Sequence, residues 1–262
     1  MLEACVHQGA GLRQAAHPHG LRIVAMCTSP GGCAQGLELL WQVCTALRQQ
    51  GLPVAVLDGT APETGDAPGL HELLAHTRWC ADIAADAASL AVFPAMHGLA
   101  WLRRHAGEAP ARQWLQPVLH AYAVAVVYAP AFVIADVLQD TATTPLVWMP
   151  ASRQGVLDAY GACKQLARTG LGATVVTVGD GRGPREDALI AGMQHALRQC
   201  AREHLGYAPA TVTARPDAPH DMTRLATVAL EHAAALPDGG MPGVGCDAAA
   251  GAWGTVRRES WM

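Results

Sequence analysis

The chain has 262 residues, of which 51% are hydrophobic and 15% charged, and its formal net charge is −4. This charge argues against a broad nucleic-acid-binding surface. No uncharged apolar run reaches the roughly 18 residues that a transmembrane helix needs, and Glu3 interrupts any signal-peptide core. The eight cysteines form no CxxC pair. We therefore expect a cytoplasmic protein with reduced thiols and no metal site.

The first predicted elements follow a leader over residues 1–20. Leu21–Cys27 is an apolar run rich in β-formers, and it leads into a glycine turn. Leu37–Gln50 has helical apolar spacing, and Pro53–Leu57 is a second strand that closes on Asp58. A strand, glycine loop, helix and strand in this order need a parallel crossover, which predicts a doubly wound sheet.

Strands and helices continue to alternate along the rest of the chain. Further strands are predicted at Ser89–Phe93, Ala121–Tyr128, Pro145–Met149, Ala173–Val178 and Ala210–Ala214. Further helices are predicted at Gly69–Ala75, Gly98–Arg104, Ala111–His120, Gly155–Arg168, Glu186–Glu203 and Met222–Leu236. The alternation predicts an α/β fold of three layers with a mainly parallel sheet. We expect one domain over residues 21–236 and a flexible tail over residues 237–262.

The glycine turn after the first strand stands where a phosphate loop would be. Such a loop cradles phosphates with backbone N–H groups, while a lysine and a Ser/Thr hydroxyl supply charge and a Mg²⁺ ligand. Gly31, Gly32 and Gly36 are present, but the lysine and the hydroxyl are absent. The reading as an ordinary βα turn stays open for the loop taken alone.

The run from Arg22 to Thr60 resembles the opening of MinD/ParA-class P-loop ATPases, whose deviant loop reads KGGxGKT. The resemblance identifies the nucleotide-binding positions as Gly31, Gly32, Cys33, Ala34, Gln35 and Gly36. It places Gln35 at the catalytic lysine, Gly36 at the Mg²⁺-binding Thr/Ser and Pro30 at the signature lysine. Asp58 matches the catalytic Asp after the second strand, as a vestigial Mg²⁺ or water site or as a plain turn residue.

Two further stretches narrow the resemblance to the flagellar-number regulators FlhG/FleN. His7–Arg13 (HQGAGLR) is similar to their DQAxGLR element, with matches at Gln8, Gly11, Leu12 and Arg13. Pro145–Lys164 resembles their PEP…DAYxxxK stretch. The resemblance implies control of flagellar number or placement, binding of the GTPase FlhF through the leader, and a homodimer that can touch the inner membrane.

The chain also departs from that pattern. Tyr128 stands where the Walker B strand should end in Asp, and Thr177 stands at the base-reading Asn. We therefore expect a degenerate ATPase with little hydrolysis and at most weak binding of ATP or ADP with Mg²⁺. Gly251 and Gly254 interrupt the tail, which argues against a membrane-binding helix there.

Three other functions remain open. The chain could be an active but atypical ATPase of the same class. It could be a MinD-like accessory factor of cellulose secretion or chromosome partition. The Gly179–Gly183 turn also allows a dinucleotide-binding oxidoreductase, although Pro184 takes the last glycine position of that motif.

Overall fold

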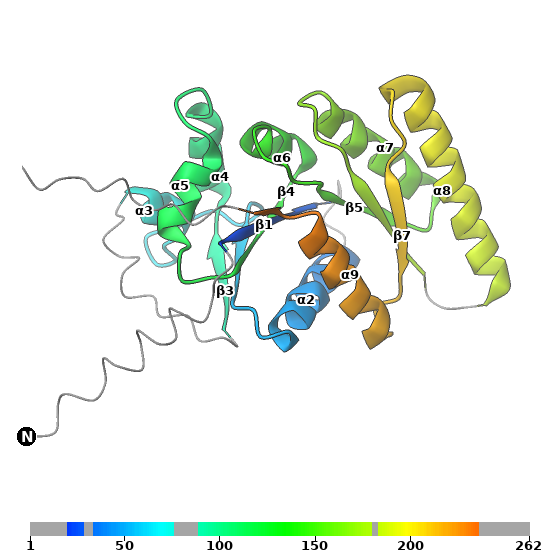
Figure 1. The fold of residues 1–262 in the computed structure, drawn as a ribbon, viewed down its shortest axis with the longest axis horizontal. Coiled ribbons are helices and arrows are strands. Elements are labelled where there is room, and N and C mark those ends of the chain that lie inside the picture. Colours follow the sequence, from blue (N-terminus) through cyan, green and yellow to red (C-terminus); the bar gives the residue numbers. More distant parts are fainter. Residues whose placement is uncertain (1–19, 29–33, 76–88, 180–182, 236–262) are drawn as a thin grey trace, which may run out of the picture.

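The computed structural model describes residues 20–28, 34–75, 89–179 and 183–235, with the side chains of residues 34 and 35 left out. Strands and helices alternate through these ranges (Figure 1). The strands are β1 (Arg22–Cys27), β2 (Val54–Asp58), β3 (Leu90–Pro94), β4 (Val124–Ala129), β5 (Leu146–Pro150), β6 (Thr174–Val178), β7 (Ala210–Ala214) and β8 (Ala234–Ala235). The helices are α2 (Ala34–Gln49), α3 (Leu70–Ala75), α4 (Met96–Arg104), α5 (Ala111–Val118), α6 (Ala131–Leu138), α7 (Arg153–Ala167), α8 (Pro184–Leu205) and α9 (Pro219–Glu231).

One sheet runs through the molecule in the order β3-β2-β4-β1-β5-β6-β7. These seven strands pair in parallel, and the short β8 pairs antiparallel with β1. β4 and β6 are buried along their whole length, as strands covered on both faces are. The chain winds outward from β1 in both directions, so the predicted doubly wound α/β fold is confirmed.

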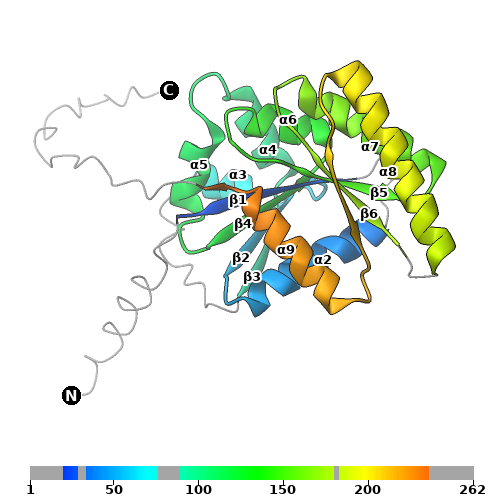
Figure 2. The ribbon, with the colours of Figure 1, turned by 45° about the vertical axis from the view of Figure 1, so that its right-hand side comes forward.

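Helices cover both faces of the sheet (Figures 1 and 2). Helices α2 and α9 pack beside each other on one face, and α3 to α8 cover the other. Side chains of β4 alternate between the two layers. Ala125 and Val127 join the core under α3 to α8, while Val126 and Tyr128 join the core under α2 and α9. Tyr128 therefore points toward α2.

The structure differs from the predicted elements in three places. Helix α6 was not predicted, because every residue in it except Asp136 is apolar and one charged residue does not mark a polar face. The strand predicted from Ala121 begins at Val124. The helix predicted to reach Leu236 ends at Glu231, and β8 then pairs with β1.

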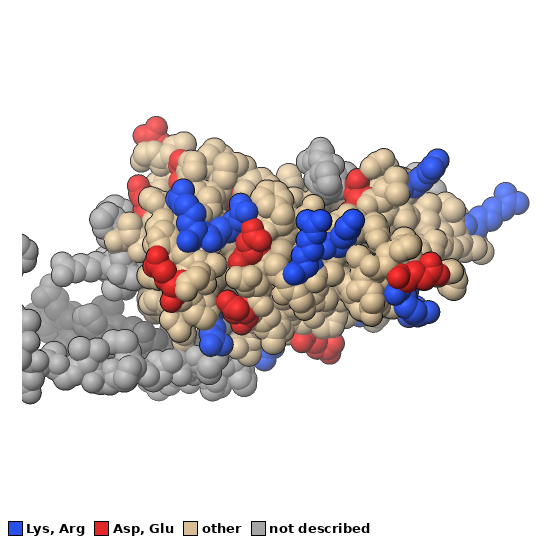
Figure 3. Space-filling view, turned by 90° about the horizontal axis from the view of Figure 1, so that it is seen from above, with Lys and Arg blue, Asp and Glu red and all other residues tan. Residues whose placement is uncertain are grey.

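The outer face of the α3 to α8 layer carries both signs of charge, with acidic and basic side chains interspersed (Figure 3). A mixed surface of this kind offers no continuous basic track for a phosphate backbone. Among the described helices, none combines the length and the apolar character that crossing a bilayer requires.

Candidate functional site

Strands β1, β2 and β4 end together at the carboxyl edge of the sheet, next to the start of α2. The register sets Met26 of β1 beside Tyr128, and Asp58 of β2 on the other side of the same tyrosine. Ligands of doubly wound sheets bind outside the carboxyl ends of the strands, where the strand order reverses. This edge is therefore the place to look for a site.

The predicted phosphate loop is only partly described. Gly31, Gly32 and Cys33 lie outside the described residues. Ala34 and Gln35 open α2, and their side chains are likewise outside the description. Gly36 follows as a buried residue in the first turn of α2. What the structure shows of this site is therefore the helix start and the strand ends that face it.

Tyr128 and Gly36 meet across this edge. A Cβ atom placed on Gly36 would lie 3.3 Å from the Tyr128 hydroxyl oxygen. The tyrosine is 6% exposed, so its ring is held in the core between β4 and α2. The phenol thus lies over the position where a residue with a side chain at 36 would project.

The resemblance to MinD/ParA-class ATPases implies a Mg²⁺-bound nucleotide at this edge, and the side chains of Gly36 and Tyr128 do not fit one. Mg²⁺ takes oxygen ligands in a tight octahedral shell, usually carboxylates, hydroxyls, phosphates and water. Gly36 offers no hydroxyl, and Tyr128 brings a bulky neutral phenol where a carboxylate is needed. The side chains at these two positions therefore supply neither the hydroxyl nor the carboxylate that such a shell normally uses.

Asp58 is committed to a local turn. Its Oδ1 atom accepts hydrogen bonds from the backbone N–H of Thr60 at 2.9 Å and from the Thr60 hydroxyl at 2.6 Å. Gly59 follows against β4, where a Cβ would come within 2.8 Å of Ala129. Asp58 therefore closes an Asx turn with its own side chain, while the vestigial Mg²⁺ or water site stays a prediction.

Glu63 is a structural residue that the sequence did not reveal. Its carboxylate accepts hydrogen bonds from the backbone N–H groups of His97 and Gly98, both at 2.7 Å, and of His71 at 3.3 Å. Burial alone would raise the pKa of Glu63, but these backbone donors outweigh it and hold the pKa below its ordinary value. The carboxylate therefore caps α4 at its positive end.

The remaining predicted positions are structural or undescribed. Thr177 lies inside β6, fully buried, and its hydroxyl accepts a hydrogen bond from Gln194 Nε2 at 3.0 Å. It is therefore a core residue and not part of the strand edge. Asp158 accepts a hydrogen bond from Gln154 on the surface of α7. The leader positions Gln8, Gly11, Leu12 and Arg13 lie outside the described residues.

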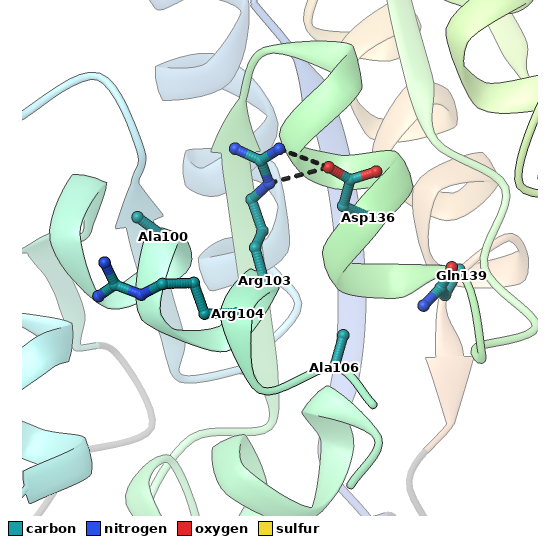
Figure 4. Close-up of a pocket in the computed structure, with 6 residues that line it drawn as sticks. All are labelled: Ala100, Arg103, Arg104, Ala106, Asp136 and Gln139. Atoms are coloured by element: carbon teal, nitrogen blue, oxygen red, sulfur yellow. Dashed lines mark hydrogen bonds and ion pairs between the residues drawn. The ribbon is translucent and has the colours of Figure 1, made fainter. Parts of the chain in front are cut away.

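A hollow of about 450 Å³ opens between α4 and α6, away from this edge (Figure 4). Arg103 donates to Asp136 Oδ2 from Nε at 2.9 Å and from Nη2 at 2.6 Å, and this pair bridges the two helices. The same guanidinium lies 5.2 Å from the ring centre of Phe132. Because the two charges neutralise each other, we interpret this ion pair as a structural contact that links α4 to α6.

The buried cysteines add no reactive group. Burial raises the pKa of Cys44 to about 12 and that of Cys163 to about 11, and it raises the pKa of Cys27 as well. A thiol with a raised pKa is a poor nucleophile and a poor metal ligand at neutral pH. Within the described ranges, no three His, Cys, Asp or Glu side chains converge on a point that could hold a metal ion.

No protein-family model matches the sequence, and no curated protein is significantly similar to it. Solved structures do match. A plasmid partition protein from Borrelia burgdorferi matches 81% of this chain and 97% of its own, with a TM-score of 0.50 and 12% identity. The chain has the fold of that partition protein. A ParA family ATPase from Chlorobium tepidum TLS covers 81% of this chain and 91% of its own, at 13% identity and a TM-score of 0.46. The MinC:MinD cell division protein complex of Aquifex aeolicus covers 77% of this chain and 85% of its own, at 13% identity and a TM-score of 0.44.

The described part of this edge holds the start of α2 and the ends of β1, β2 and β4, where the strand order reverses. Of the three predicted positions described there, Asp58 brings a carboxylate, Tyr128 brings a phenol and Gly36 has no side chain.

Proposed function

We propose that this protein is a MinD-like regulator of flagellar number or placement that acts by protein contact and not by ATP turnover. The absence of ATP turnover in this proposal is supported by the close approach of Tyr128 to Gly36. A phenol lies against a glycine where phosphate-loop ATPases need a carboxylate opposite a hydroxyl.

The proposed loss of catalysis follows from the number of missing catalytic groups. An electrostatic element that stabilises a transition state typically contributes on the order of 3 kcal/mol. The lysine at position 35, the hydroxyl at position 36 and the carboxylate at position 128 are all replaced. Asp58 alone does not replace these three groups, and its Oδ1 atom is already bonded to Thr60. Any remaining nucleotide binding would rest on backbone N–H groups and would be weak.

The flagellar role rests on the leader and on α7. Residues 7–13 resemble the element through which FlhG/FleN proteins engage the GTPase FlhF, and Asp158 to Lys164 resembles their DAYxxxK stretch. In this proposal Gln8, Gly11, Leu12 and Arg13 contact an FlhF-type partner. The protein would work in the cytoplasm, with any contact at the inner membrane made through that partner.

A role in plasmid or chromosome partition is the second candidate. It is supported by the likeness in fold to the Borrelia burgdorferi partition protein. The net charge of −4 argues against direct, nonspecific DNA binding of the kind a partition role would use.

A paired experiment separates these functions. Deletion of the gene should change the number or position of flagella, and a Gln8→Ala/Arg13→Ala variant should reproduce the deletion. The matched control is Gln14→Ala, which removes a polar side chain next to the element but outside its matched positions. Normal flagella together with unequal plasmid inheritance would favour the partition role instead.

Calorimetric titration tests the loss of ATP chemistry. Adding ATP with Mg²⁺ should give no binding at submicromolar affinity and no heat of hydrolysis. Measurable hydrolysis that disappears in Asp58→Ala would restore the reading as an active, atypical ATPase and refute the pseudoenzyme.

A further inference from the structure

Helix α8 presents an unusual face to solvent. It spans 22 residues, and its buried residues are Ile190, Leu197 and Ala201. From Ala188 to Leu197 it carries no charged residue, although most of this stretch is exposed. A solvent-facing helix surface is normally polar, so this face has the composition of a surface that is covered.

An apolar groove lies along the same face, between α7 and α8, which run beside each other (Figure 1). Its volume is about 450 Å³. Val156 and Leu157 line it from α7, Leu189 and Met193 line it from α8, and Arg153 at the start of α7 adds one charged side chain. Leu157 is 56% exposed and Leu189 is 53% exposed. Two large apolar side chains therefore flank one groove without being buried by the chain around them.

Gly192 sits at the middle of this face. A Cβ atom on Gly192 would meet nothing within 4 Å, so no described part of the chain requires a glycine there. Glycine in a helix interior costs about 1 kcal/mol relative to alanine. Ala188 and Ala196 lie one turn to either side. Small side chains at this spacing let a second helix approach closely.

The charges at the ends of α8 indicate what that second helix is. On the face that carries Gly192, Arg185 lies in the first turn of α8 and Glu203 in the last. The acidic residues of the first turn and the basic residues of the last turn lie on other faces: Glu186, Asp187, Arg202 and His204. Each charge has the same sign as the helix dipole at its own end, which is unfavourable. Beside an antiparallel copy of α8, each would lie at the end of opposite sign. Arg185 would then face Glu203 of the partner subunit, and the same pair would occur twice about a twofold axis.

We propose that two copies of this chain form a twofold dimer in which α8 of each packs antiparallel into the α7–α8 groove of the other. Gly192 lies close to the axis, and Leu157 and Leu189 are buried against the partner subunit. The dimer needs no nucleotide, since α8 lies outside the strand edge that holds Gly36 and Tyr128. The dimer does not rest on the proposed function: Val156 and Leu157 belong to α7, but the described residues that line the groove include none of the leader or of the Asp158–Lys164 stretch.

The test is sedimentation velocity on the full chain, in buffer without nucleotide. The wild type should be a dimer. Arg185→Glu and Glu203→Arg should each place two like-charged pairs in contact and raise the dimer dissociation constant by about tenfold or more. An equal mixture of the two variants should form a heterodimer with near-wild-type affinity, because both pairs are then of opposite sign. The double variant Arg185→Glu/Glu203→Arg should also dimerise.

Arg198→Glu is the matched control. It makes the same change in net charge on the same helix, outside the face that carries Gly192, and should leave the dimer intact. Circular dichroism should show all variants folded, since residues 185, 198 and 203 are exposed. A monomeric wild type, an affinity unchanged by either reversal, or single variants that fail to recover on mixing would each overturn the proposal.

Discussion

Tyr128 and Gly36 are complementary in size, and this makes an unusual prediction for a helix glycine. Gly→Ala inside a helix normally stabilises by about 0.5–1 kcal/mol. Gly36→Ala should instead be neutral or destabilising, because the new methyl group would lie 3.3 Å from the buried Tyr128 hydroxyl. In a Tyr128→Phe background the hydroxyl is gone, and the same alanine should recover its stabilising effect. Urea unfolding of the four proteins measures the coupling.

Gly161 provides the matched control for this cycle. It lies inside α7, and a Cβ atom there would meet nothing within 4 Å. Gly161→Ala should therefore stabilise in both backgrounds by the ordinary helix amount. If Gly36→Ala behaves like Gly161→Ala while Tyr128 is intact, the phenol does not fill the space that we assign to it.

Glu63 makes a second prediction at the scale of single residues. Glu63→Gln should lower the free energy of unfolding by about 1–2 kcal/mol at neutral pH, because three backbone N–H groups lose a charged acceptor. The pKa of Glu63 is lower in the folded chain than its ordinary value. Its stabilisation is therefore complete above the unfolded pKa and is lost as pH falls through the folded pKa.

The measurement for Glu63 is urea unfolding of wild type and Glu63→Gln between about pH 7 and pH 3. The gap between them should narrow as the solution becomes more acidic. His97→Ala removes the contact between His97 Nδ1 and Glu63 Oε2 at 3.2 Å but keeps the backbone N–H that bonds to Glu63, so it should cost less than Glu63→Gln. A gap that is constant with pH would show that the carboxylate charge does not matter.

At the scale of elements, the sequence predicted the strands best. Strands such as β4 and β5 are uninterrupted apolar runs, which is the pattern expected of a buried parallel strand. Helix α6 was not predicted, because it is mostly buried and its single charged residue, Asp136, does not mark a polar face. The sequence shows that Tyr128 stands where the Walker B strand should end in Asp. Its contact with Gly36 joins residues far apart in the chain, so it follows only from the register of β4 in the sheet. Glu63 had no signal, since its partners are His71, His97 and Gly98.

The start of α7 gives a prediction at this scale. Ser152 caps the helix, and its hydroxyl accepts the backbone N–H of Gly155 at 3.0 Å. Ser152→Ala should destabilise the protein by about 1 kcal/mol, while Ser152→Asp should restore the cap. Asp158→Asn, one turn further on, changes only a surface bond to Gln154 and should leave thermal unfolding unaltered. Equal losses for Ser152→Ala and Ser152→Asp would show that the hydroxyl is not the cap.

For the whole molecule, the proposed loss of ATP chemistry predicts how stability responds to nucleotide. A ligand that binds only the folded state stabilises it by RT ln(1 + [L]/Kd), which is about 4 kcal/mol at a thousandfold excess over Kd. A nucleotide-switched protein with micromolar affinity should therefore melt several degrees higher in about 1 mM ATP with Mg²⁺. This chain should show no such shift, and EDTA should make no difference to its melting temperature in ATP. A magnesium-dependent rise would mean that the metal enters despite Tyr128.

The variant Gln35→Lys/Gly36→Thr/Tyr128→Asp introduces the three groups that the resemblance places at these positions, and its melting temperature should be compared with that of the wild type. A shift that is present in this variant and absent in the wild type would place the loss of switching in these three side chains.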